Sequence, residues 1–175
     1  MKTAVRTAAL AAAFVPALMS AQAPVATAFR LNEMEMAKNL VAAAEIMPAD
    51  KYSFKPTPAQ MSFGDIVTHL SQGNDFLCAK ISGKVAPTRS KLGPAADKPA
   101  MVARLKETFD FCAEALAGLD DSRLGEEMPL FGGKAMSRAA VELLTTGDWA
   151  DHYSQFAIYL RLNGHLPPTA KKPAM

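Results

Sequence analysis

The chain has 175 residues, which is the size of one domain, and half of its residues are apolar, which is enough for a sizeable core. The N-terminal segment described below holds Lys2 and Arg6. Without them, 17 of the 19 basic residues remain against 17 acidic ones, so the net charge is near zero. No cluster of Lys and Arg is left that could follow a phosphate backbone, which argues against a nucleic-acid partner.

A targeting segment is predicted at the start of the chain. Lys2 and Arg6 precede an apolar run over residues 7–19, and small residues with the A-x-A pattern of a cleavage site follow. This order is typical of a secretory signal peptide, which we predict over residues 1–23, with cleavage as late as residue 28 as the alternative. The run is shorter than the about 20 residues that span a bilayer. We therefore expect no membrane span after cleavage and a periplasmic or secreted mature protein.

Four helical patterns follow the targeting segment. Their predicted bounds are about Thr27–Met47, Ser62–Gly83, Pro99–Gly118 and Ser137–Gly164. The apolar stripe of the first helix is predicted to consist of Leu31, Met34, Leu40, Val41 and Ala44. The second begins at Ser62, a good N-cap with Asp65 at the third helical position, and the fourth ends where Asn163 and Gly164 precede two prolines. Between the last two helices, Gly132 could turn a short two-stranded ribbon.

The helices predict an all-α four-helix bundle over residues 29–168, followed by a disordered tail over residues 169–175. The connection over residues 84–97 decides the topology of the bundle. Its fourteen residues can span about 46 Å, whereas the second helix is only about 33 Å long. The loop can therefore cross the whole bundle and start the third helix parallel to the second, although a long loop can also fold back.

The second helix carries a histidine that could bind a metal ion. His69 lies within the apolar rows, with Asp65 four residues before it and Gly73 four residues after it. The small residue leaves room beside the imidazole, and the carboxylate could orient the ring from behind. The alternative is a core histidine that is hydrogen bonded to a backbone or carboxyl group.

The last helix carries an acid and an imidazole on one face. Asp148 and His152 are four residues apart, so both side chains can point at the same object. They offer two metal ligands, and a third from a facing helix would complete an open site. Gln155 continues this stripe and could bond a ligand or a bound water. The alternative is a partly solvated pair that stabilises the helix by a few tenths of a kcal/mol. His165 follows the helix stop and is most simply a surface loop residue.

Two stretches carry a resemblance to a known family. SFGDIVTHLSQGNDFLC and DHYSQFAIYLRLNGHLPP resemble the DinB (damage-inducible B) family of metal-binding four-helix bundles, over about residues 30–168. The resemblance implies an up-down-down-up bundle with a crossover between helices two and three. It also implies a divalent ion held by three histidines, one on helix two and two on the last helix. His69 and His152 match the first and third of these positions, and Asp148 stands at the second.

A carboxylate is a legitimate ligand, so His69, Asp148 and His152 form the predicted metal site. Two imidazoles and one carboxylate suit zinc first, with iron, manganese or nickel as alternatives. The exchange of an imidazole for a carboxylate could also weaken the site, change its metal or abolish binding.

The resemblance implies metal-dependent hydrolysis, or transfer reactions that use low-molecular-weight thiols. A thiol made in the cytoplasm would be scarce outside it, so we expect metal-assisted hydrolysis or transfer on an unknown small molecule. The motifs G-x-S-x-G, H-E-x-x-H and C-x-x-C do not occur, and catalytic residues stay unknown. The alternative is a non-catalytic binding or stress-associated protein with a residual metal pocket. A homodimer is left open.

The two cysteines, Cys78 and Cys112, are predicted to form a disulfide, because export places the chain where disulfides persist. The alternative is two separate buried cysteines. Cys78 lies 16 residues beyond Ser62, and Cys112 lies 13 beyond Pro99. Parallel helices would therefore place them within roughly 4.5 Å along the axis, and antiparallel helices roughly 12 Å apart. A bridge needs Cα atoms within about 7 Å, so it also tests the topology.

Overall fold

The computed structural model describes residues 23–92 and 97–170. The predicted signal peptide, apart from its last residue, and the last five residues of the predicted tail lie outside these ranges. The elements are the helices α1 (Pro24–Ile46), α2 (Phe63–Ser82), α3 (Lys98–Leu116) and α4 (Arg138–Leu162), and the strands β1 (Glu127–Pro129) and β2 (Ala135–Ser137). None of these helices is long and apolar enough to cross a bilayer.

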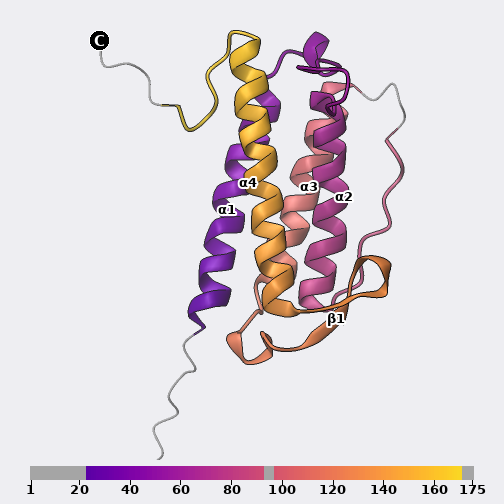
Figure 1. Cartoon of the computed structure of the whole chain (residues 1–175), viewed down its shortest axis with the longest axis vertical. Helices are drawn as coiled ribbons and strands as arrows, with labels where there is room; N and C mark the ends of the chain where they lie inside the picture. The colour runs from indigo at the N-terminus through magenta and orange to yellow at the C-terminus, as the bar shows by residue number, and fades with distance from the viewer. Residues whose placement is uncertain (1–22, 93–96, 171–175) are drawn as a thin grey trace, which may run out of the picture.

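The four helices form the predicted bundle (Figure 1). α1 and α4 run in one direction, and α2 and α3 run in the other. Around the bundle, α1 packs on α4 and α3, while α2 packs on α3 and α4. The all-α prediction and the up-down-down-up order with a long crossover are therefore confirmed. The antiparallel ribbon of β1 and β2 is the short two-stranded ribbon expected before the last helix.

Local capping signals explain where α2 and α4 begin. The Ser62 hydroxyl accepts a hydrogen bond from the Asp65 backbone N–H at 3.1 Å, and the Asp65 carboxylate accepts one from the Ser62 N–H at 3.0 Å. This reciprocal pair satisfies two N–H groups that a helix start leaves free. α2 ends at Gly83, whose φ of 76° suits glycine. Ser137 caps α4 through a bond from the Ala140 N–H.

The first helix differs from its prediction in two respects. It begins at Pro24, because the carboxylate of Asp121, distant in the sequence, accepts the N–H groups of Val25 and Ala26 at 3.1 and 2.8 Å. The predicted apolar stripe is wrong in its first half, since Leu31 and Met34 are exposed. The buried residues of α1 are Ala26, Phe29, Glu33, Asn39, Leu40, Ala43 and Ala44.

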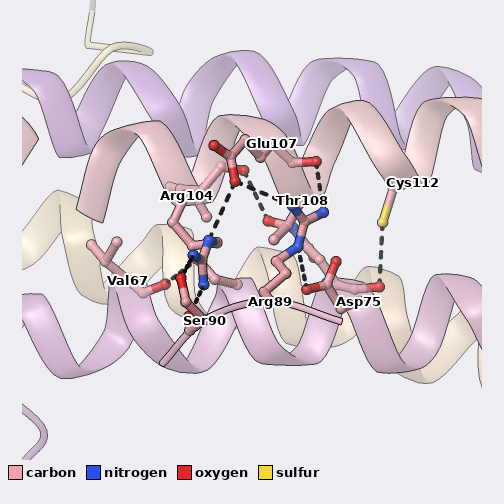
Figure 2. Close-up of polar contacts among 11 residues, drawn as sticks. Val67, Asp75, Arg89, Ser90, Arg104, Glu107, Thr108 and Cys112 are labelled. Atoms are coloured by element: carbon pink, nitrogen blue, oxygen red, sulfur yellow. Dashed lines mark hydrogen bonds and ion pairs between the residues drawn. The ribbon is translucent and has the colours of Figure 1, made fainter. Parts of the chain in front are cut away.

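The crossover between α2 and α3 is tied to both helices (Figure 2). The Arg89 guanidinium lies between Asp75 of α2 and Glu107 of α3, at 2.7 and 3.1 Å from their carboxylates. Arg104 of α3 donates to the Ser90 carbonyl at 3.0 Å. A charged side chain of the loop thus bridges the two helices that the loop connects.

A disulfide joins the same two helices. Cys78 of α2 and Cys112 of α3 are bonded, and their Cα atoms lie 5.2 Å apart. One helical turn earlier on each helix, Asn74 donates to Thr108 at 3.2 Å. The equal offset of the two contacts reflects the parallel course of α2 and α3.

At the C-terminal end, Thr169 lies within the predicted disordered tail, and its hydroxyl accepts a hydrogen bond from Tyr153 at 2.8 Å.

Candidate metal centre

Three side chains meet at the seam between α2 and α4. His69 comes from α2, and Asp148 and His152 come from successive turns of α4. The Oδ1 atom of Asp148 lies 3.4 Å from Nε2 of His69 and 3.3 Å from Nε2 of His152. The imidazole rings are 4.7 Å apart between centroids, and the ligand atoms of the three residues all lie within 4.8 Å of one another. The structure thus brings together the three predicted ligands.

The two contacts of Asp148 are long for hydrogen bonds, and their lengths also match the separation of ligands that share one metal ion. An N–H···O bond is usually about 2.9 to 3.0 Å long. Tetrahedral ligands with bonds of about 2.1 Å to one metal ion lie about 3.4 Å apart. Both nitrogen-to-oxygen distances at Asp148 match this second value. Two bonds of this length span at most about 4.2 Å. The ligand atoms spread over as much as 4.8 Å, so the imidazoles would have to move closer together to share an ion.

The site opens toward solvent on the α2 side. The side chain of His152 is 9% exposed, that of Asp148 is 26% exposed, and that of His69 is 46% exposed. Beside His69 lies a cavity of about 370 Å³, whose lining includes Asp65, Gln72 and Met101. One ligand is therefore anchored in the core, and of the three candidate ligands only His69 lines the cavity.

The electrostatics favour an ionised carboxylate. Burial by itself would raise the pKa of Asp148, but the hydrogen bond and charge of His152, followed by those of His69, outweigh burial and hold the pKa below its usual range. A carboxylate must be ionised to bind a metal. Nδ1 of His152 is buried and has no hydrogen-bond partner among the described residues.

A buried polar network positions the α4 part of the site. The indole N–H of Trp149 donates to the Asn74 side-chain oxygen at 2.8 Å, and the Asn74 amide donates to Thr108 at 3.2 Å. Trp149 directly follows Asp148, so this network fixes the position of the carboxylate along the helix axis relative to α2. Sequence reasoning did not find this network. The one feature of the sequence that points to this network is Asn74, a polar residue at a core-facing position of a helix.

Gly73 lies opposite the carboxylate and not only beside the imidazole. A Cβ atom at Gly73 would stand 3.7 Å from Oδ2 of Asp148, which is ordinary van der Waals contact. A side chain as small as alanine would therefore fit at this position beside the acid of α4, whereas the sequence had suggested that the glycine makes room for His69.

The other predicted pocket residues have different roles. Asp65 lines the cavity beside His69, but its carboxylate accepts the Ser62 N–H as a helix cap. Gln155 donates to Asp151 at 2.8 Å, and no hydrogen bond in residues 23–92 and 97–170 links it to the three candidate ligands. The predicted role of Gln155 at the site is therefore not seen.

Together, fold and site define a four-helix bundle with a candidate metal centre between its second and last long helices. The sequence model of the DinB superfamily matches residues 35–156. The chain therefore belongs to the DinB superfamily, which is a metal-binding superfamily, and the resemblance noted in the sequence is confirmed.

Solved structures of the same fold support this assignment. A DinB-like protein from Bacillus subtilis is 19% identical, with a TM-score of 0.67 over 84% of this chain and 99% of that one. A DinB-like protein from Bacillus cereus is 14% identical, with a TM-score of 0.69 over 83% of this chain and 97% of that one. A conserved protein from Enterococcus faecalis is 12% identical, with a TM-score of 0.64 over 79% and 96%. No curated protein matches the sequence. At these identities the similarity concerns the fold.

Proposed function

We propose that the protein binds one divalent metal ion through His69, Asp148 and His152 and uses it for hydrolysis or group transfer on a small molecule. The observation that carries this proposal is the position of Oδ1 of Asp148, at 3.4 and 3.3 Å from the two imidazole nitrogens. Two nitrogens and one oxygen suit zinc first, and iron, manganese or nickel as alternatives.

The chain's own residues divide the work between anchoring and access. His152 is buried and fixes the site to the core, while His69 stands at the edge of the cavity. A bound ion would polarise a substrate or lower the pKa of a bound water. The cavity of about 370 Å³ falls within the size range of small-molecule sites, and its lining of Met, Gln and Asp side chains offers apolar contact and hydrogen bonds.

We propose that this chemistry takes place outside the cytoplasm. The signal-like first residues support export, and so does the bond between Cys78 and Cys112, because disulfides persist in oxidising compartments. A cytoplasmic thiol cosubstrate would be scarce there, which favours hydrolysis over thiol transfer.

A second candidate is a non-catalytic binding or stress-associated protein that keeps the metal pocket. The observation that favours it is the lack of a positioned base among the described residues near the site. Hydrogen bonds from Ser62 lower the pKa of Asp65, so this carboxylate is a weak base. Gln155 is turned to Asp151.

Elemental analysis of protein purified without an affinity tag tests the site. We expect about one divalent ion per chain, and loss of most of it in His69→Ala and His152→Ala, because two ligands hold an ion poorly. His165→Ala removes a histidine outside the site and should keep the metal. Unchanged metal content in both site variants would refute the proposed ligands.

Activity assays then separate the two candidate functions. The zinc-loaded protein is screened against ester, amide and phosphoester substrates. Turnover that disappears in His152→Ala supports the enzyme, whereas tight metal binding without turnover supports the binding protein.

A further inference from the structure

A second cavity lies away from the metal centre, between the first halves of α1 and α4. Its volume is about 400 Å³. Apolar side chains make up much of its lining: Val25, Ala28 and Phe29 from α1, and Ala139 and Leu143 from α4. Val25 and Leu143 are themselves exposed, so an incoming molecule can displace them with little loss of packing. We refer to this cavity as the α1–α4 groove.

Three acceptor oxygens at the α1–α4 groove have no hydrogen-bond donor among the described residues. Glu142 lines it and is only 3% exposed, and both of its carboxylate oxygens are buried without a hydrogen-bond partner among the described residues. The side-chain oxygen of Asn32 is likewise buried and unpartnered. The Thr146 hydroxyl already donates to the Leu143 carbonyl at 2.9 Å. Buried acceptors without partners are costly, so a ligand that brings donors is favoured here.

We propose that the α1–α4 groove binds a primary amine with an apolar body, and that Glu142 and Asn32 hold its ammonium group. An ammonium carries three N–H donors. The groove offers three unpartnered acceptor oxygens, two from Glu142 and one from Asn32. The apolar body then packs against Phe29 and Leu143.

The electrostatics of Glu142 agree with a cationic ligand. Burial raises the pKa of its carboxyl, Arg138 lowers it, and Asp121 raises it, with a net upward shift. The charges around Glu142 therefore do not offset the cost of burying its ionised carboxylate, and a cation beside it would stabilise this form.

Arg138 is the internal alternative to an external amine. It precedes Glu142 by one turn, and its Nη1 atom is buried without a partner among the described residues. However, Arg138 donates to the Glu126 carboxylate at 2.8 Å and to the Arg123 carbonyl at 3.3 Å, which turns its guanidinium toward the loop before the ribbon. Neither Nη1 nor any other atom of Arg138 forms a hydrogen bond with Glu142, so both Glu142 oxygens stay free for an external donor.

Titration of isotope-labelled, zinc-loaded protein with three six-carbon probes tests the proposal. The probes are hexylammonium, 1-hexanol and hexanoate, and the readout is the shift of the backbone amides of Ala28 and Ala139. We expect saturable shifts with hexylammonium at an affinity at least about tenfold above that for hexanol, as hydrogen bonds to a charged group provide, and no binding of hexanoate.

Variants separate the role of the carboxylate from that of the groove. Glu142→Gln should remove the preference for hexylammonium over hexanol, whereas Glu114→Gln, the same change on an exposed residue of α3, should leave it intact. Ala139→Leu fills the groove without touching the acid and should weaken both probes, which keeps the test valid if Glu142→Gln does not fold. Absence of saturable shifts, equal binding of all three probes, or an unchanged preference in folded Glu142→Gln would overturn the proposal. Because the site is separate from the metal ligands, His152→Ala should bind hexylammonium as the wild type does.

Discussion

Replacing Trp149 by Phe should both destabilise the bundle and loosen the metal centre. Trp149 and Asn74 are each 1% exposed, and the indole N–H is the donor to the Asn74 side-chain oxygen, at 2.8 Å. A phenyl ring keeps an aromatic contact with Phe29 and Phe109 but has no donor. The Asn74 oxygen would then be a buried acceptor without a partner.

The expected cost follows from two contributions. An unsatisfied buried acceptor costs about 1–3 kcal/mol. The volume lost between indole and phenyl leaves a small cavity and adds about 1 kcal/mol. The free energy of unfolding should therefore fall by about 2–4 kcal/mol, which corresponds to a decrease in Tm of roughly 5–15 °C for a chain of this size. Because Trp149 adjoins Asp148, zinc affinity should also fall, by about tenfold or more.

Urea unfolding followed by circular dichroism measures this cost, since the variant has lost the only tryptophan. In a double-mutant cycle, Asn74→Leu combined with Trp149→Phe should cost less than the sum of the single changes by about 1 kcal/mol or more, because both polar partners are removed together. Tyr153→Phe, which deletes two exposed hydrogen bonds between the same helix and Thr169, should change stability by less than about 0.5 kcal/mol. An equally small cost for Trp149→Phe, or strict additivity in the cycle, would refute this account of the network.

Three further predictions concern the metal, the disulfide and an acid in the core. Asp148→His should move metal preference toward ions that favour nitrogen, such as zinc, nickel or copper, and competition titrations that give the same preference for both forms would place Asp148 outside the coordination sphere. Replacing Cys78 and Cys112 by Ala should lower the free energy of unfolding by about 3–4 kcal/mol, because the bridge closes a loop with a sequence separation of 34; two thiols freely alkylated in denatured, unreduced protein would contradict the bond. Burial raises the pKa of Glu33 to about 7 from 4.5, so the folded state holds this proton to higher pH than the unfolded state. The stability that Glu33 contributes is therefore complete below about pH 4.5 and is lost as pH rises through about 7, by up to about 3 kcal/mol. Urea midpoints measured across this range should depend less on pH in Glu33→Gln than in the wild type, whereas Glu35→Gln should keep the wild-type dependence.

The parts of the fold that local chemistry controls could be predicted from the sequence. Ser62 and Asp65 start α2 because a hydroxyl and a carboxylate three residues apart satisfy each other's backbone N–H groups. Asp148 and His152 share a face because residues four apart on a helix lie above one another. His69 was assigned as their partner through the family resemblance, because spacing alone does not say which helices are neighbours.

Features that depend on distant contacts could not be predicted. α1 begins at Pro24 because Asp121, from a later segment, caps it. Leu31 and Met34 fit a helical stripe, but the direction of the core is set by where α3 and α4 pack, and both side chains face solvent. Glu33 and Glu142 look like surface acids in the sequence, yet both are buried.

The crossover explains why a metal site can form on this bundle at all. In an up-down-up-down bundle each helix neighbours the next in sequence, so the second and fourth helices are diagonal, at about 13 Å if neighbours are 8–10 Å apart. Here α2 and α4 are neighbours, and His69 reaches Asp148 across their outer seam, where its side chain is 46% exposed. A diagonal pair has no shared outer seam, so a half-exposed histidine could not meet a carboxylate of the other helix. Arg89 and the bond between Cys78 and Cys112 hold α3 parallel to α2 on its other side. These residues provide no candidate ligand, but the arrangement that they stabilise leaves the α2–α4 seam open to the three side chains of the candidate metal centre.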